Sequence, residues 1–293
     1  MHLTALATAV AAIIPTALSA AVTTRPGCVA PPPSEEEAEF LRASAIKAIA
    51  HEESGGIKTA DVPIIDMYVH VVTRGPSEAD GHVPLSVVYA QYNRIVEDFA
   101  PSGIQFNLAG VDWYQNATWA ADQDQMAMKR ALRQGGYAAL NLYFLVDFGV
   151  GNPGGTGYCY LPVQNAPAPG SDTMIVDGCT MALQTMPTNP DCGGCCNWCD
   201  TGRIATHEVG HWLGLAHTFD GGCSEPGDGI SDTPASEMTS GCPSGTVDTC
   251  PGMPGTDPLH NHMSYTNDYC RNEFTPQQML VMGYNYWTLR HGK

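Results

Sequence analysis

Apolar residues recur along this chain with two different periods, and the alternation of these periods predicts the order of its elements. Residues 63–73 alternate between apolar and polar positions and are rich in β-branched side chains, which predicts a strand. Residues 86–99 carry apolar side chains at helical spacing and predict a helix. The remaining patterns predict a strand over 104–113, a helix over 122–134, a buried strand over 140–148, a short strand over 173–178 and a closing helix over 274–290. This order indicates an α/β domain with a twisted mixed sheet.

The amino-terminal residues predict export from the cell. Residues 3–20 are apolar and end in small residues, which is typical of a secretory signal peptide, here assigned to residues 1–20. No later stretch is apolar for long enough to span a bilayer. We therefore expect a secreted, extracellular protein that does not insert into a membrane.

A segment of different composition separates this leader from the first strand. Three consecutive prolines are stiff and extended. Ser34 and Glu37 follow them as a capping box, which predicts a helix that runs to about Glu53. We expect residues 21–56 to form a separate segment and residues 57–293 to form the main domain.

Composition and charge narrow the class of protein. The 293 residues are 43% hydrophobic and 15% charged, which describes a globular chain long enough to bury a core. The net charge of -17 argues against binding to nucleic acid or to anionic membranes. A glycosylation sequon at Asn116-Ala117-Thr118 is consistent with a surface loop in a secreted chain.

The chemistry of the chain concentrates in the pattern H-E-x-x-H-x-x-G-x-x-H. Positions four apart share one face of a helix, so His207 and His211 can point at one metal ion. Glu208 sits one step further round, where its carboxylate faces a metal-bound water. Gly214 can adopt a left-handed backbone that ends the helix, so that His217 returns as a third ligand. Three imidazoles and one open position describe a catalytic zinc site, whereas a structural site is closed by four protein ligands.

Further motifs give this pattern a family context. The stretch Asn261-His262-Met263-Ser264-Tyr265 resembles the Met-turn of the metzincin metallopeptidases. Together with the stretches 217–223, 229–234 and 274–277, it makes the chain similar to the pappalysin family, and above all to its secreted fungal-type members. The likeness is densest over 203–278.

The resemblance implies a metzincin-type α/β (α+β) catalytic domain. Such a domain has a mixed five-stranded sheet, a backing helix and an active-site helix. Its upper subdomain would reach to about residue 214, and a loop-rich, disulfide-bonded lower subdomain would span 215–293. The segment 21–56 resembles the family's pro-segment.

The resemblance also assigns roles around the metal. Met263 is implied as an apolar floor beneath the histidines, and Tyr265 as a side chain that flanks the metal and hydrogen-bonds the transition state. The stretch 157–161 is implied as an edge strand above the cleft that pairs with substrate; the alternative is a plain glycine-rich turn. Tyr269 stands where family members that prefer basic residues carry an acidic side chain, so a basic preference is not expected. The substrate-binding residues are then Gly157, Tyr158, Cys159, Tyr160, Leu161 and Tyr269.

The cysteine count fits a precursor with one unpaired thiol. Ten of the 11 cysteines follow Cys28, which suits five disulfides. Cys28 is either part of a structural disulfide or a switch whose thiolate fills the fourth position on zinc; Val29 departs from the glycine that usually follows a switch cysteine. The resemblance pairs Cys223 with Cys250 and Cys242 with Cys270. The other six allow fifteen pairings or, less favourably, a thiolate metal site: Cys159, Cys179, Cys192, Cys195, Cys196 and Cys199.

An acidic loop after the zinc motif is a candidate calcium site. Asp228, Asp232 and Thr233 offer the oxygen ligands that calcium favours, and the resemblance implies calcium in this region. The alternative is an acidic turn that is simply solvated.

These observations predict a secreted zinc endopeptidase, made as a latent precursor and acting as a monomer on protein or peptide substrates. Zinc would polarise the scissile carbonyl and acidify its water, whose proton Glu208 would take. A secreted effector or binding module with zinc as a structural clip is the alternative, but such a clip needs no base. A zinc hydrolase that does not act on peptides is disfavoured because the Met-turn belongs to peptidases.

Overall fold

A computed structural model describes residues 27–28, 33–55, 63–187 and 199–293. The predicted signal peptide and three of the cysteines, Cys192, Cys195 and Cys196, lie outside the described residues. Among the described residues, no helix is both long and apolar enough to cross a membrane.

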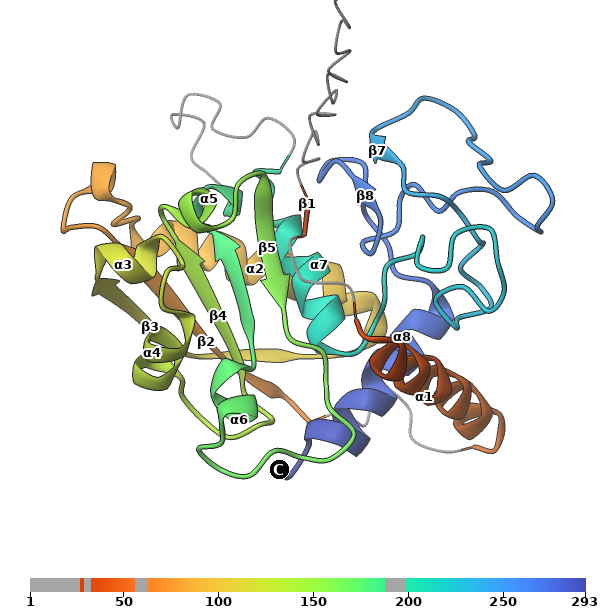
Figure 1. The fold of residues 1–293 in the computed structure, drawn as a ribbon, viewed down its shortest axis with the longest axis horizontal. Helices are drawn as coiled ribbons and strands as arrows, with labels where there is room; N and C mark the ends of the chain where they lie inside the picture. The colour runs from red at the N-terminus through yellow and green to blue at the C-terminus, as the bar shows by residue number, and fades with distance from the viewer. Residues whose placement is uncertain (1–26, 29–32, 56–62, 188–198) are drawn as a thin grey trace, which may run out of the picture.

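A mixed five-stranded sheet forms the centre of the protein (Figure 1). Neighbouring strands run parallel except for the antiparallel pair β5 and β6. A two-residue strand, β1, adds to the outer edge of β5, which gives the order β1-β5-β6-β4-β2-β3. The strands are β1 Gly27–Cys28, β2 Ile65–Thr73, β3 Phe106–Gln115, β4 Leu140–Leu145, β5 Gly155–Cys159 and β6 Cys179–Ala182.

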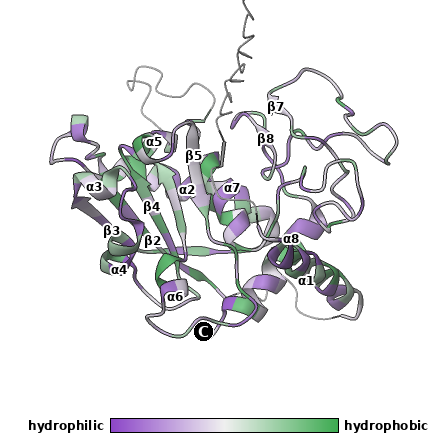
Figure 2. Cartoon of the chain, viewed as in Figure 1, coloured by the Kyte–Doolittle hydropathy of each residue, from purple (hydrophilic) through white to green (hydrophobic). Residues whose placement is uncertain are grey.

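Helices cover both faces of this sheet. Apolar residues of α2 and α7 join one face of β2 and β4 in the larger core, whereas α4 packs on the other face with Val72 and Tyr143. Figure 2 shows hydrophobic residues concentrated on the central strands. The α-helices are α1 Glu35–Glu53, α2 Leu85–Phe99, α3 Ala117–Ala120, α4 Gln125–Leu132, α5 Phe148–Gly151, α6 Asp172–Val176, α7 Arg203–Trp212 and α8 Pro276–Asn285.

Two predicted elements differ from the structure. The stretch 173–178, predicted as a strand, is the helix α6, because the Ser171 hydroxyl accepts the Met174 N–H and caps a helical turn; the strand begins only at Cys179. The closing helix is α-helical only to Asn285, and residues 286–290 form a π-helical turn. The other predicted elements are present with shifted ends.

The N-terminal helix α1 is packed against the main domain. Its predicted capping box is present, since the Ser34 hydroxyl accepts the Glu37 N–H and the Glu37 carboxylate accepts the Ser34 N–H. Ala45 and Ala48 belong to the main core. The buried Ser44 hydroxyl donates to Asn285 on α8, at 2.6 Å. Helix α1 therefore lies beside α8, as Figure 1 shows.

The long segment from His217 to Met263 carries little regular structure and is held by disulfides. The two predicted pairs, Cys223–Cys250 and Cys242–Cys270, are both formed. The loop closed by the first pair contains β7 Ser240–Gly241, and the loop closed by the second contains β8 Tyr265–Thr266, which pairs with β7. A third disulfide, Cys159–Cys179, joins β5 to β6, and Cys199 is also disulfide-bonded.

Candidate metal centre and active site

The helix α7 starts at a buried carboxylate. Asp268, which is fully buried, accepts the backbone N–H groups of Thr201 and Arg203, each at 3.2 Å. A negative charge at this end of a helix is favourable because the first N–H groups have no partner within the helix. Arg271 forms a buried ion pair with the same carboxylate. Asp268 therefore stabilises the start of α7. Its neighbour Tyr269, a predicted substrate-binding residue, is 59% exposed.

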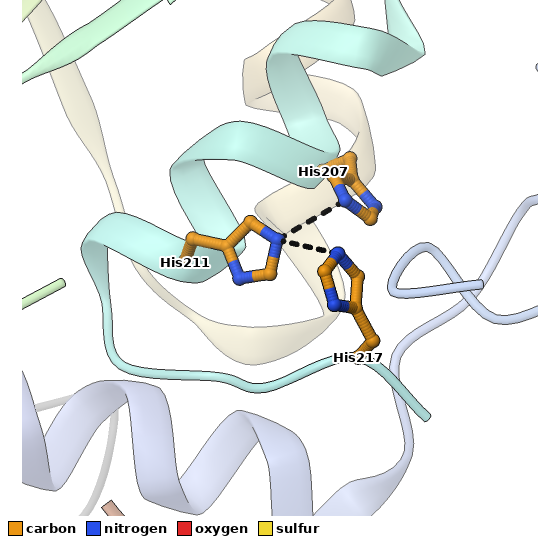
Figure 3. A group of neighbouring side chains, drawn as sticks. All are labelled: His207, His211 and His217. Atoms are coloured by element: carbon orange, nitrogen blue, oxygen red, sulfur yellow. Dashed lines mark hydrogen bonds between the residues drawn. The ribbon is translucent and has the colours of Figure 1, made fainter. Parts of the chain in front are cut away.

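Three histidines converge at the end of this helix, as Figure 3 shows. Nε2 of His211 lies 3.1 Å from Nε2 of His207 and 3.2 Å from Nε2 of His217. Their ligand atoms lie within 4.8 Å of one another. In a tetrahedral zinc site, with Zn–N bonds of about 2.0–2.1 Å, neighbouring nitrogens lie about 3.3 Å apart. The spacing of the three rings therefore fits zinc.

The hydrogen bonds of the ring nitrogens also indicate a metal ion between the rings. Nδ1 of His207 donates to the His262 carbonyl at 2.7 Å, and Nδ1 of His211 donates to the Leu215 carbonyl at 2.8 Å. This tautomer leaves both Nε2 atoms with lone pairs that face each other, which is favourable only with a cation between them. Burial lowers the pKa of His207 well below its usual value and lowers the pKa of His211 to about 3, so both rings are neutral ligands.

The third histidine reaches this site because the chain turns at Gly214, just after the end of α7. Its φ is +90°, in the left-handed region that favours glycine, so the predicted turn is present. Any side chain at Gly214 would collide with the amide of Asn285. That amide donates to the Leu213 carbonyl at 3.1 Å. The turn that returns His217 is thus braced by α8.

Met263, implied by the resemblance as an apolar floor, lies against the helix α7 that carries His207 and His211. It is fully buried, and any side chain at Gly210 on α7 would collide with its sulfur. The Tyr265 ring centroid lies 4.8 Å from that of His217 and 5.8 Å from that of His207. The structure therefore brings both predicted residues next to the histidines.

Strand β5 passes beside the candidate base. A Cβ atom at Gly157 would lie 3.0 Å from Oε1 of the fully buried Glu208. Gly157, Tyr158 and Cys159 lie within β5, whereas Tyr160 and Leu161 follow its end. The stretch is therefore a strand rather than only a turn. Strand β1 runs parallel to it, with Cys28 opposite Gly157.

A cavity of about 860 Å³ opens at the histidine cluster. It runs from His211 and His217 along the stretch 158–164, and the first turns of α1 form its opposite wall. Its lining is acidic, with Glu36, Glu37, Asp122, Asp172 and Asp220. A space of this size and shape can hold several residues of an extended peptide.

One residue that packs behind the cavity lining could not be identified from the sequence. Lys129 of α4 is fully buried, and its Nζ donates to the Val176 carbonyl at 2.7 Å. The same Nζ lies 5.5 Å from the Tyr158 ring centroid and 4.8 Å from that of Tyr160. Burial lowers its pKa to about 7. Lys129 supports the two tyrosines from behind, although a lysine in an amphipathic helix is usually read as exposed.

The candidate calcium residues come together only in part. Asp228 and Thr233 are hydrogen-bonded to each other at 2.8 Å, while Asp232 accepts the Gln277 N–H at 2.9 Å. Burial raises the pKa of Asp228 to about 7.

Comparison with known proteins gives these features a family. Residues 136–285 match the peptidase M43 family model, described as pregnancy-associated plasma protein-A. The chain belongs to the pappalysin family of metallopeptidases. An extracellular metalloprotease of Pyricularia oryzae is 45% identical over 279 residues, 93% of each chain. Extracellular metalloprotease 1 of Coccidioides posadasii is 46% identical over 265 residues, 90% of this chain and 89% of that one.

Solved structures of the metzincin mirolysin share the fold of this pappalysin. Mature mirolysin of Tannerella forsythia, in complex with a cleaved peptide, is 25% identical with a TM-score of 0.58, over 78% of this chain and 96% of its own. A promirolysin structure has a TM-score of 0.61 at 23% identity, over 88% of this chain and 96% of its own. The expected family and the metzincin-like fold are confirmed, and the names of the relatives support an extracellular metalloprotease.

Proposed function

We propose that this pappalysin is a secreted zinc endopeptidase in which Glu208 is the general base. The observation that carries this proposal is the convergence of three imidazole Nε2 atoms beside a buried carboxylate, at the mouth of a large cavity. His207, His211 and His217 would hold the zinc ion. The edge of β5 lies next to the same carboxylate and would pair with an extended substrate.

Each group in the proposed site has a separate role in the reaction. Zinc would supply a Lewis acid that polarises the scissile carbonyl and stabilises negative charge on its oxygen. Glu208 accepts a proton from the attacking water and returns it to the leaving amine, so no proton is lost to solvent. Tyr265, beside His217, donates a hydrogen bond to the oxygen on which charge develops. The substrates are proteins or peptides, and the enzyme acts as a monomer.

Metal removal tests this proposal directly. A chelator should abolish the hydrolysis of casein by the processed protein, and added zinc should restore it, because the three imidazoles lose and regain their shared ion. Hydrolysis rate and bound zinc are measured on the same samples, with circular dichroism as a control for folding. Casein hydrolysis that persists in zinc-free, folded protein would contradict the proposal, and zinc binding without any hydrolysis would favour a binding module.

We also infer that the enzyme is made as a latent precursor. The boundaries would be a signal peptide over 1–20, a pro-segment over 21–56 and a catalytic domain over 57–293, with subdomains that meet at about residue 214. Two contacts support this division. Strand β1 occupies the outer edge of β5, and α1 walls the cavity that reaches the histidines. The N-terminal sequence of the secreted, active protein would locate the activation cut.

Replacing Cys28 with serine tests whether this residue maintains latency. The Cys28→Ser precursor should cleave peptides without processing, because a serine hydroxyl is a much weaker zinc ligand than a thiolate. Hydrolysis of a fluorogenic peptide is followed with the intact chain length checked on a gel. If mutant and wild-type precursors are equally inactive, Cys28 is not a switch, and a disulfide at this position becomes the better interpretation.

We also propose that Asp228, Asp232 and Thr233 bind calcium. The buried Asp228 carboxylate and the Thr233 hydroxyl bonded to it support the proposal. Calcium titration should raise the melting temperature of the wild-type protein but not that of Asp228→Asn, since binding to the folded state alone stabilises it. An unchanged wild-type melting temperature would indicate a solvated acidic turn.

Passage through the secretory pathway would also allow N-glycosylation of Asn116. Endoglycosidase treatment of the secreted protein should then lower its mass, and the Thr118→Ala chain should show no change.

A further inference from the structure

Two aromatic side chains flank the sequon at Asn116. The Tyr114 side chain, on β3, is 42% exposed. Its ring stacks on that of Trp119, with centroids 5.0 Å apart and planes 24° apart. Strand β3 is the edge of the sheet opposite β5, and Figure 1 shows β3 and α3 on the other side of the sheet from α7, which carries two of the three histidines. The pair presents an apolar surface to solvent at a place that the peptidase mechanism does not use.

The backbone directs Asn116 to the same side as Tyr114. Asn116 has φ of -158° and ψ of 107°, so it continues the extended conformation of β3 by one residue. In an extended chain, side chains two residues apart point to the same side, and their origins lie about 6.5–7 Å apart. A sugar attached to Asn116 therefore emerges beside the Tyr114 ring.

The hydrogen bonds of Asn116 leave its nitrogen available for such an attachment. The side-chain oxygen accepts the N–H groups of Thr118 at 3.0 Å and Trp119 at 3.1 Å, which caps helix α3. Glycosylation forms a bond from the side-chain nitrogen to C1 of N-acetylglucosamine. The bond that breaks joins C1 to the diphosphate of a lipid-linked oligosaccharide donor, and the amide loses one proton. Neither cap hydrogen bond is disturbed by this transfer.

We propose that the first N-acetylglucosamine of an Asn116-linked glycan packs on the platform formed by Tyr114 and Trp119. The C–H groups on one face of the sugar ring contact the aromatic face, where dispersion attraction and the removal of apolar surface from water both favour the contact. The glycan then holds the end of β3 against α3 and covers an exposed sheet edge that could otherwise pair with another chain. The sugar acts as a structural part of this edge.

A double-mutant cycle measures this contact. The full chain is secreted from a eukaryotic host that glycosylates, and the glycan is trimmed enzymatically to a single N-acetylglucosamine. We expect this one sugar to raise the melting temperature by about 2–4 °C relative to the unglycosylated Thr118→Ala chain. In a Tyr114→Ala background the same comparison should give no difference. Hydrogen exchange over residues 106–120 should slow with the sugar only when Tyr114 is present.

A matched variant distinguishes packing of the sugar on Tyr114 and Trp119 from a stabilisation that does not depend on this contact. Tyr89, on α2, is 49% exposed and lies outside this region, so the sugar should still raise the melting temperature of the Tyr89→Ala chain. Absence of a sugar on Asn116 in peptide mass maps would overturn the proposal. An equal rise in melting temperature with and without Tyr114 would also overturn it. The inference depends on secretion and not on catalysis, and an inactive protein would give the same outcome in these measurements.

Discussion

Replacing Glu208 with glutamine should lower the kcat of peptide hydrolysis by about 10²–10⁴-fold, the usual contribution of a positioned general base. Glutamine has almost the same volume, so it should occupy the same buried position beside Gly157. Its amide cannot accept a proton from water or return one to the amine. The Nδ1 contacts that orient His207 and His211 do not involve this side chain, so bound zinc should stay near one ion per chain. The measurements are steady-state kinetics on a fluorogenic peptide and metal analysis of the same preparation.

A second carboxylate in the same cavity provides the control. Asp172 also lines the cavity, but its side chain is 78% exposed and pairs with Arg130 at the surface. Asp172→Asn removes one negative charge from the site and should change kcat by no more than about twofold. Substantial hydrolysis by purified Glu208→Gln protein would remove Glu208 from the mechanism. An equal loss in both variants would indicate that general acidity of the cavity matters more than one base.

Replacing Asp177 with alanine should lower the free energy of unfolding by about 3–5 kcal/mol, because it leaves buried cations without their partner. The Asp177 carboxylate is 2% exposed. It accepts hydrogen bonds from the Arg290 guanidinium at 3.0 Å and from the Trp212 indole N–H at 3.2 Å. Arg133 lies 3.4 Å away. Arg290 is fully buried, with its guanidinium carbon 3.9 Å from the Trp212 ring centroid. We expect the melting temperature to fall by about 10 °C.

Two comparisons test the cause of this loss. The double variant Asp177→Ala, Arg290→Met removes one of the two orphaned charges, the one that is fully buried, and should be more stable than Asp177→Ala alone. Disrupting the exposed pair between Arg130 and Asp172, whose 2.9 Å separation is as short, should cost at most about 1 kcal/mol. Thermal unfolding followed by circular dichroism reports all three. If Asp177→Ala melts like the wild-type protein, the buried network does not stabilise the end of α7.

The pattern along the chain predicts the elements that are regular and long. Strand β2 and helix α2 were predicted within two residues of their ends, because alternation and helical spacing persist over nine or more residues. The pattern also predicts the convergence of the three histidines, because His207 and His211 lie on α7 and the left-handed Gly214 lies in the turn that follows it. The helical repeat alone places His207 and His211 on one face of α7, with Glu208 beside His207.

Short elements and distant partners are not predictable in this way. The apolar run Met174-Ile175-Val176 has the composition of a strand, yet a single serine cap makes it helical. Asp177 and Arg290 are 113 residues apart, and each alone is typical of a solvent-facing charge. The same holds for Lys129, which only tertiary packing buries. Asn116 was identified as a glycosylation signal, although it also caps α3.

The disulfide Cys159–Cys179 joins the last residue of β5 to the first residue of β6, directly across the antiparallel pair. This link means that the rim of the cleft cannot slip by one residue against the sheet, a slip that would exchange which side chains face inward and which face outward. Chain made in a reducing cytosol would lack that restraint. In the proposed mechanism, the alignment of a bound peptide with Glu208 is therefore coupled to the redox state of the compartment in which the protein matures.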